Sequence, residues 1–182
     1  MIVARPQDIV ITPMGARFMG RMIPCTVGRG GVVDAAIKRE GDGGTPTGVH
    51  AIGPVLYRPD RIPSPVPGAM PIGPGDLWSD DAGDAAYNQH VRAPYAPSHE
   101  KLRRADPMYD LVVVTGWNWP LAVAGRGSAI FIHQWRRPGA PTAGCIGFSR
   151  RDLHWIVANL AEDSRLIVQP RQPRQFFVRT TI

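Results

Sequence analysis

The sequence predicts a mostly β fold, a sandwich or a mixed sheet, with a single helix late in the chain. Short apolar runs, several of them alternating with polar residues, are separated by glycine and proline turns along most of the chain. Only the segment that follows Ser149 has apolar residues at helical spacing. Between Tyr57 and Asp110, repeated prolines interrupt any long regular element.

The first half of the chain begins with a predicted hairpin. Residues 8–12 form its first strand, Pro13 to Gly15 the turn, and the alternating residues 16–27 a return strand and a third strand. Residues 28–31 and 41–44 are rich in glycine but have neither the lysine nor the spacing of a phosphate-binding loop, so we interpret both as hairpin turns.

Four further elements complete the predicted sheet. Residues 49–57 form a strand, and residues 110–115 form another that does not alternate and is therefore buried on both faces. Residues 128–135 form the strand that carries His133, and residues 165–169 return as the last strand.

The helix has a start signal and an apolar stripe. Ser149 and Asp152 have the spacing of a capping box. The apolar stripe consists of Leu153, Ile156, Val157 and Leu160. The tail that follows, residues 171–182, has no strong period, and we expect its segment 176–178 (Phe-Phe-Val) to dock on the sheet.

Length and composition predict one domain. A chain of 182 residues that is 43% hydrophobic can bury a full core, so residues 1–182 are expected to form a single domain. The proline-rich residues 58–109 are interpreted as an insertion without regular secondary structure that covers one side of the functional site. No apolar stretch approaches the ~18 residues of a membrane span. No signal peptide precedes the first strand, which predicts a cytoplasmic protein, or a periplasmic one if the start is not the native one.

The positive charge permits several anionic partners. The net charge is +6, and Lys38 and Lys101 are the only lysines among 21 basic residues. No helix-turn-helix or other nucleic-acid signature accompanies the charge, so nucleic acid is not expected as a partner. Arginines near Cys145 in the sequence either recognise carboxylates through their planar guanidinium groups or are solvated surface residues: Arg126, Arg136, Arg137, Arg150 and Arg151.

The chemistry-bearing residues of this chain are His133 and Cys145. His133 ends an apolar strand, and twelve residues later Gly144 and Cys145 form a turn that presents a thiol. Thiolate attack requires a base beside the sulfur and backbone N–H groups directed at the developing oxyanion. A buried cysteine and a satisfied core histidine are the structural alternatives. Cys25 has no nearby histidine and is interpreted as structural.

The acidic residues of the insertion are weaker candidates for a site. Asp76, Asp80, Asp81, Asp84, His90 and His99 have ligand chemistry but no recognised metal-binding order. We interpret the aspartates as turn formers, and we expect neither a metal nor a cofactor.

Two separated segments resemble the L,D-transpeptidase family with its YkuD-type catalytic domain. Residues 41–48 (Gly-Asp-Gly-Gly-Thr-Pro-Thr-Gly) are similar to the glycine-rich loop of that family, which ends in T-P-x-G. Ile132 and His133, followed by residues 142–146 (Thr-Ala-Gly-Cys-Ile), are similar to its histidine and its S/T-x-G-C-hydrophobic signature. The resemblance implies a β-rich fold from about residue 9 to residue 168.

The resemblance also implies a reaction. Cys145 is the implied nucleophile and His133 its base, with the amides of Gly144 and Cys145 as oxyanion donors. The family attacks an L,D-peptide bond of a peptidoglycan stem tetrapeptide, releases the terminal D-alanine and holds the remainder as a thioester. An amine acceptor makes the enzyme a transpeptidase, whereas water makes it an L,D-carboxypeptidase. A non-catalytic module that binds anionic glycans is the alternative from another class.

Three positions depart from the pattern of the family. Ala143 replaces a frequent histidine, Gly147 stands where arginine or asparagine is usual, and Gln134 stands where glycine or serine is common. The departures leave the nucleophile and base intact but alter the groups around the substrate. We therefore expect Thr142 in the substrate-binding site, with Arg136, Arg137 or Arg150 taking over the binding of carboxylates.

Overall fold

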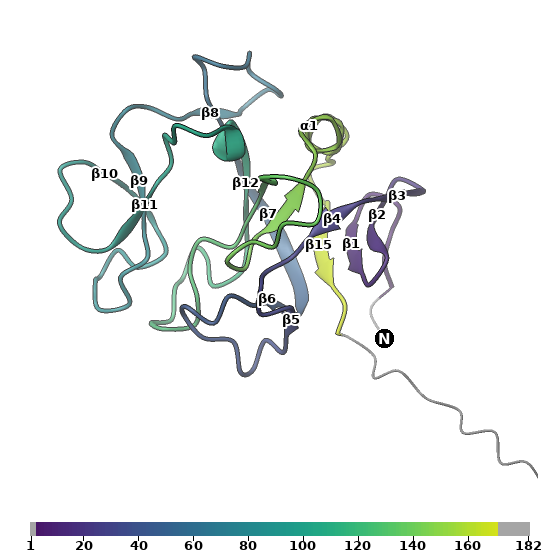
Figure 1. Cartoon of the computed structure of the whole chain (residues 1–182), viewed down its shortest axis with the longest axis horizontal. Helices are drawn as coiled ribbons and strands as arrows, with labels where there is room; N and C mark the ends of the chain where they lie inside the picture. The colour runs from purple at the N-terminus through teal and green to yellow at the C-terminus, as the bar shows by residue number, and fades with distance from the viewer. Residues whose placement is uncertain (1–2, 171–182) are drawn as a thin grey trace, which may run out of the picture.

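The computed structural model describes residues 3–170, and its centre is a long curved sheet (Figure 1). The strands of this sheet are β1 (Ile9–Thr12), β2 (Gly15–Phe18), β3 (Arg21–Ile23), β4 (Cys25–Thr26), β7 (Gly48–Tyr57), β8 (Met70–Pro71), β12 (Leu111–Thr115), β13 (Phe131–Gln134), β14 (Ile146–Phe148) and β15 (Arg165–Val168). Their order is β3-β2-β1-β15-β7-β12-β13-β14-β4, and β8 pairs with β7. Because β3 and β4 are consecutive in the chain, the two ends of the sheet come close together and the mixed sheet is nearly closed. The β-rich prediction is confirmed.

The predicted N-terminal hairpin is confirmed. β1 and β2 pair antiparallel with Thr12 opposite Gly15, and the Thr12 hydroxyl donates a hydrogen bond of 2.8 Å to the Gly15 carbonyl. The third strand is divided by Pro24 into β3 and β4, because proline has no N–H to continue the ladder. β4 then pairs with β14, so this N-terminal unit reaches the strand that follows Cys145.

The two central strands match the apolar pattern. All residues of β12 are buried, as the absence of alternation predicts, and β12 pairs antiparallel with β7 and β13. β13 is shorter than the predicted residues 128–135 because Ala129 has φ +50°, which is outside the extended region. The side chain of Thr115 donates a hydrogen bond of 2.5 Å to the Ile130 carbonyl in this irregular approach to β13.

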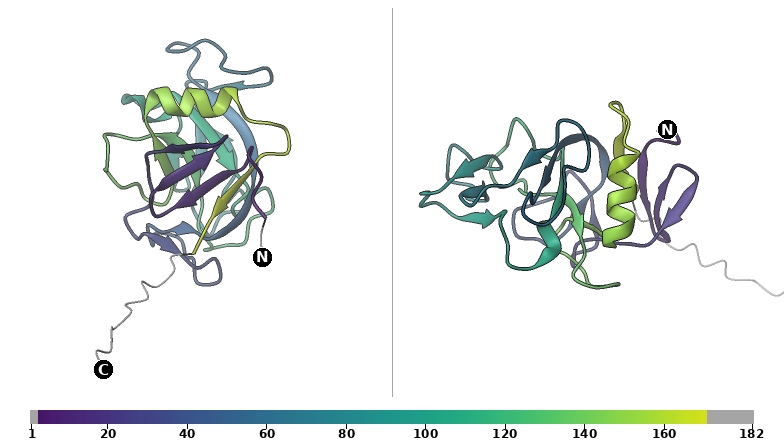
Figure 2. Two further views of the ribbon diagram at one scale, coloured as in Figure 1. Left: turned by 90° about the vertical axis from the view of Figure 1, so that its right-hand side faces the viewer. Right: turned by 90° about the horizontal axis from the view of Figure 1, so that it is seen from above.

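The predicted helix is confirmed as α1 (Arg150–Ala158). The Ser149 hydroxyl accepts a hydrogen bond of 3.0 Å from the Asp152 backbone N–H, which caps the helix. The buried stripe consists of Leu153, Ile156 and Val157, and Leu160 lies beyond the last helical residue. Figure 2 shows α1 across one end of the sheet, close to the N-terminal strands.

The prediction that the glycine-rich segments are hairpin turns is wrong. They lead into β5 (Val32–Val33) and β6 (Thr45–Pro46), which pair in parallel and therefore cannot form a hairpin. The Gly30 N–H donates to the Gly43 carbonyl at 2.9 Å, so the two segments lie side by side. A Cβ at Gly28 would lie 2.0 Å from the Gly43 oxygen, which shows that glycine here permits close backbone contact.

The expectation of an insertion without secondary structure is also wrong. β9 (Asp76–Ser79) pairs antiparallel with both β10 (His90–Arg92) and β11 (His99–Lys101), and a short 3₁₀ helix η1 (Pro107–Tyr109) follows. Prolines separate these short strands and do not interrupt them. Figure 1 shows this small sheet on the side of the molecule opposite β1 to β3.

Two further sequence predictions concern membrane-spanning segments and the C-terminal tail. In residues 3–170, no helix is long and apolar enough to cross a membrane. The predicted docking of residues 176–178 lies outside the described residues.

A buried ion pair joins the start of β1 to the start of β15. Asp8 is 1% exposed, and its carboxylate accepts hydrogen bonds from the guanidinium groups of Arg165 at 2.6 Å and Arg5 at 3.2 Å. The hydrogen bond from Arg165 has the largest effect on the pKa of Asp8, and the bonds from Arg5 add a smaller one. Together they hold this pKa well below its usual range. The stabilisation is therefore present above the unfolded pKa of about 4 and is lost as pH falls below it.

We predict that Asp8→Asn lowers the free energy of unfolding by about 3 kcal/mol at neutral pH, because Arg165 loses its carboxylate partner and Arg5 keeps only the exposed Asp163. Urea unfolding provides the measurement. The matched control is Asp163→Asn, since Asp163 also contacts Arg5 but its side chain is 60% exposed, and its loss is expected to stay below about 1 kcal/mol. Equal losses in the two variants would contradict the assignment.

Candidate active site

The pairing of β13 with β14 brings His133 and Cys145 to one face of the sheet. The two strands are parallel, with Ile132 opposite Ile146. Because side chains alternate along a strand, Phe131 and His133 face away from Ile132. Cys145, just before Ile146, belongs to the same buried cluster as Phe131, whereas Ile132 and Ile146 belong to the main core.

Both side chains line one cavity of about 620 Å³. The insertion supplies one wall of this cavity through Glu100, Arg104, Met108 and Tyr109, and the loop before Cys145 supplies another through Arg136, Arg137 and Thr142. Arg29 contributes from the first glycine-rich segment. The cavity therefore combines a thiol, an imidazole and several guanidinium groups.

Cys145 is buried and neutral in the free protein. Its side chain is held by two backbone groups: Sγ donates to the Ala129 carbonyl at 3.0 Å and accepts from the Phe131 N–H at 3.4 Å. Burial, followed by the negative charge of Glu100, raises the pKa of Cys145 to about 12. A free thiolate is thus not the resting form, and the proton must leave during the reaction.

His133 is oriented by its neighbour in the strand. Nδ1 lies 2.8 Å from the Gln134 carbonyl, which can only accept, so Nδ1 carries the hydrogen and Nε2 is free to accept a proton. Burial lowers the pKa of His133 to about 4, so the imidazole is neutral at neutral pH. The Tyr109 ring packs edge to face on the imidazole at 5.1 Å between centroids.

Thr142 and Gly144 shape the turn that presents the thiol. The Thr142 hydroxyl donates to the Cys145 carbonyl at 2.6 Å and accepts from the Gly144 N–H at 3.1 Å. Gly144 has φ +140°, and a Cβ there would lie 2.9 Å from the Ile130 Cδ1 atom. The Gly144 N–H is therefore already engaged within the turn.

Thr45 connects this turn to the glycine-rich segments. Its side chain is fully buried, donates to the Gly144 carbonyl at 2.7 Å and accepts from the Gly28 N–H at 2.9 Å. A further bond of 2.8 Å runs from the Arg29 N–H to the Thr142 carbonyl. The segments that the sequence predicted as separate turns thus form the support of the Cys145 turn.

The chain was compared with family models, curated proteins and solved structures. It matches the YkuD model, described as the L,D-transpeptidase catalytic domain, over residues 12–168. This chain belongs to the L,D-transpeptidase family. No curated protein and no solved structure matches it. The match confirms the resemblance based on residues 41–48, His133 and Cys145.

The arginines predicted to bind carboxylates lie in two different places in this L,D-transpeptidase domain. Arg136 and Arg137 are exposed and line the cavity, whereas Arg150 lies in the first turn of α1 with Nη1 3.4 Å from the Asp110 carboxylate. The sequence reasoning missed two other arginines of the cavity, Arg29 and Arg104. Arg29 follows Gly28 in a segment that was interpreted as a turn, so the glycine pattern contained a signal for it.

Glu100 and Tyr109 were also missed as residues of the L,D-transpeptidase cavity. The Tyr109 hydroxyl donates to the Glu100 carboxylate at 2.5 Å, and both residues come from the proline-rich segment. No periodic pattern in that segment indicates which side chains face the cavity. The density of prolines was the available signal that the segment covers a functional surface.

One departure from the family pattern has a local explanation. A Cβ at Gly147 would lie 2.6 Å from the Thr26 hydroxyl and 3.1 Å from the Trp135 Cβ atom, so β4 and Trp135 close the space that a larger residue needs. Gln134 orients His133 through its backbone carbonyl, which any residue would supply, so the structure does not explain the glutamine side chain. The structure offers no account of Ala143.

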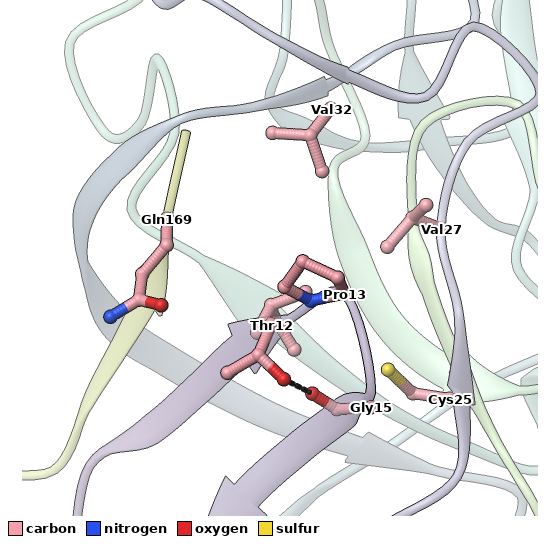
Figure 3. A pocket seen from close by; sticks show the side chains of 8 residues that line it. Thr12, Pro13, Gly15, Cys25, Val27, Val32 and Gln169 are labelled. Atoms are coloured by element: carbon pink, nitrogen blue, oxygen red, sulfur yellow. Dashed lines mark hydrogen bonds between the residues drawn. The ribbon is translucent and has the colours of Figure 1, made fainter. Parts of the chain in front are cut away.

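Cys25 lies in a different environment from Cys145. Figure 3 shows Cys25 beside a separate cavity of about 120 Å³ formed by the N-terminal strands, Val27, Val32 and Gln169. No histidine lines this cavity among residues 3–170. Burial raises the pKa of Cys25 to about 11. These surroundings contain no base, which supports the structural interpretation of Cys25.

Two of the four aspartates, Asp81 and Asp84, act as turn formers, whereas Asp76 lies in β9 with its carboxylate 3.2 Å from the Arg92 guanidinium. Asp81 accepts from the Gly83 N–H at 2.9 Å, and Asp84 accepts from the Ala86 N–H at 2.7 Å. In the part of the chain that the structure describes, no group of three or more His, Cys, Asp or Glu side chains has a geometry that suits a metal ion.

We predict that Thr45→Val lowers the free energy of unfolding by about 3 kcal/mol, because the buried Gly28 N–H and Gly144 carbonyl lose their shared partner. It should also speed alkylation of Cys145, measured by peptide mass mapping, since the turn is no longer held in place.

Thr47→Val is the matched control for this substitution. Thr47 accepts a single bond from the Ala35 N–H at 3.0 Å, away from Gly144, so a loss of about 1 kcal/mol with unchanged alkylation is expected. If both variants alkylate at the wild-type rate, Thr45 does not position the Cys145 turn.

Proposed function

We propose that this domain is a cysteine acyl-transfer enzyme acting on peptidoglycan stem tetrapeptides. Cys145 attacks the L,D-peptide bond, releases the terminal D-alanine and holds the remaining tripeptide as a thioester. The observation that carries the proposal is the placement of Cys145 and His133 on one face of the sheet, in a single arginine-lined cavity. Membership of the L,D-transpeptidase family supports the same chemistry.

The acylation step uses the groups that orient the two side chains. As Sγ attacks the scissile carbonyl carbon, its proton passes to Nε2 of His133, which the Gln134 carbonyl keeps in the accepting tautomer. The Phe131 N–H stabilises the negative charge that develops on Sγ. Because the Gly144 N–H is engaged with Thr142, we assign the oxyanion to the Cys145 N–H. His133 then returns the proton to the departing amine of D-alanine.

Cys145 and His133 are both uncharged before the peptide binds, and this restricts the reaction to a bound substrate. With a thiol pKa of about 12 and an imidazole pKa of about 4, a preformed ion pair is strongly disfavoured in the free cavity. Proton transfer is then coupled to attack on a bound peptide. This coupling limits the reaction of Cys145 with other electrophiles in solution.

The arginines supply the recognition of the peptide carboxylates. In residues 3–170, Arg29, Arg136 and Arg137 form no ion pair with a carboxylate, whereas Arg104 is held by Asp106 at 2.7 Å. Exposed guanidinium groups at a cavity bind carboxylates through paired N–H donors. We assign Arg136 and Arg137, with Arg29, to the carboxylates of the stem peptide or muropeptide.

The acyl-enzyme has two fates. Attack by an amine of a second stem gives a cross-link and makes the domain a transpeptidase, whereas attack by water makes it an L,D-carboxypeptidase. A cytoplasmic enzyme would meet soluble precursors and recycled fragments, and a periplasmic one the wall itself. Both fates require the thioester, and a non-catalytic glycan-binding module would form none.

We predict that intact-mass spectrometry of the protein mixed with a stem tetrapeptide detects a thioester adduct and free D-alanine. Cys145→Ala should abolish both, because the nucleophile is removed. Cys25→Ala is the matched control and should retain both. If the wild-type protein forms no adduct and releases no D-alanine, the catalytic proposal fails and the glycan-binding alternative remains.

We predict that release of D-alanine continues well below pH 6 and is lost as pH falls through about 4, where His133 becomes protonated and can no longer accept a proton. The measurement is kcat/KM from about pH 3 to about pH 8, because this ratio reports groups of the free enzyme. Circular dichroism over the same range controls for unfolding. An acid limb near 6.5, the ordinary histidine value, would contradict the assigned role of burial.

A further inference from the structure

Glu100 is a carboxylate without an ion-pair partner in a cavity whose charged lining residues are otherwise arginines. It is the only acidic residue among the lining residues in the described part of the chain, and it faces the same space as Cys145 and His133. Its oxygen Oε2 accepts from the Tyr109 hydroxyl at 2.5 Å. No lysine, arginine or histidine of residues 3–170 lies within ion-pair distance of it, although Arg104 lines the same cavity.

The burial of Glu100 makes the absence of a cation costly. Burial raises the pKa of Glu100, and the hydrogen bond from Tyr109 and the positive charge of Arg104 only partly offset this effect. A carboxylate that is half-buried and has no ion-pair partner favours a ligand that brings a cation. The arginines provide for the anionic groups of the peptides, so Glu100 is the group of this cavity that suits a cationic one.

We propose that Glu100 binds the primary ammonium group of the acyl acceptor and takes up its proton, so that an amine is selected over water. This proposal rests on the proposed function, since it concerns the fate of the Cys145 thioester. It identifies the insertion as the element that determines the acceptor, because Glu100 lies in β11 and its partner Tyr109 in η1.

The proton balance of aminolysis fits the groups present. The ammonium nitrogen gives one proton to Glu100 and becomes a neutral amine. That nitrogen attacks the thioester carbonyl, so a C–N bond forms and the C–S bond breaks. A second proton passes through His133 to the departing sulfur of Cys145, and the third stays on the new amide. Glu100 then returns its proton to solvent.

Glu100 acts in opposite directions on the two half-reactions. Its negative charge opposes loss of the Cys145 proton during acylation, as its contribution to the raised thiol pKa shows. During aminolysis the same charge attracts and deprotonates the acceptor. Removal of the charge should therefore leave acylation equal or faster and make aminolysis slower, whereas general damage to the site slows both.

The test is Glu100→Gln, assayed with a stem tetrapeptide as donor and a second stem with a free amine as acceptor. Mass spectrometry follows thioester formation, cross-linked product and hydrolysed product. We expect thioester formation at or above the wild-type rate and at least a tenfold fall in the ratio of cross-linked to hydrolysed product, as for loss of a general base. Glu162→Gln, which neutralises an exposed glutamate, should leave rate and ratio unchanged.

Glu100→Asp keeps the negative charge and is expected to retain a preference for the amine. This second variant keeps the proposal testable if Glu100→Gln does not fold. The inference is overturned if Glu100→Gln forms thioester with an unchanged product ratio, if it loses acylation and aminolysis together, or if the wild-type thioester only hydrolyses at saturating acceptor. The proposed function survives each of these results. It fails only if the wild-type protein forms no thioester.

Discussion

The buried hydroxyl of Thr45 is the contact on which the geometry of the site depends. It bonds at once to the Gly28 N–H and the Gly144 carbonyl, so three segments far apart in the sequence meet at one oxygen atom. Each of the three must approach closely, and glycine is present where a Cβ would collide. The glycine-rich motif therefore supports the Cys145 turn through backbone contacts.

The second constraint is the burial of Cys145 and His133, which disfavours the charged form of each side chain. The same apolar packing that places Cys145 beside Phe131 and His133 against Tyr109 keeps both reacting groups uncharged. Cations at the cavity and one carboxylate from the insertion then supply the charges that the two core residues lack. In the proposed reaction, the core sheet contributes the nucleophile and base, while loops and the insertion contribute the groups assigned to the peptide.

Periodicity in the sequence predicts the strands that form the centre of this fold. The uninterrupted apolar run of β12 and the capped stripe of α1 are unambiguous, because packing and local preference agree in both. The placement of His133 and Cys145 could be predicted for a similar reason, since His133 lies in β13 and Cys145 directly precedes β14. Thr142 lines the cavity while its hydroxyl holds the turn, and Arg150, one of three arginines expected to bind carboxylates, lies 3.4 Å from Asp110.

Contacts between distant segments could not be predicted in this way. The parallel pairing of β5 with β6, the approach of Gly30 to Gly43 and the position of Glu100 all depend on tertiary structure that leaves no period in the chain. Short strands between prolines are equally hidden, because each is only three or four residues long. The missed residues of the cavity come from these same segments.

The position of β15 has a consequence for how the molecule is made. β15 is the last strand of the described chain, yet it lies between β1 and β7, parallel to the first and antiparallel to the second. Synthesis proceeds from the N-terminus, so the N-terminal hairpin must wait for nearly the whole chain before it gains its neighbour in the sheet. Contacts of such long sequence separation make folding slow. A ribosome-bound intermediate that ends before residue 165 thus exposes the edges of β1 and β7, which β15 covers in the folded domain.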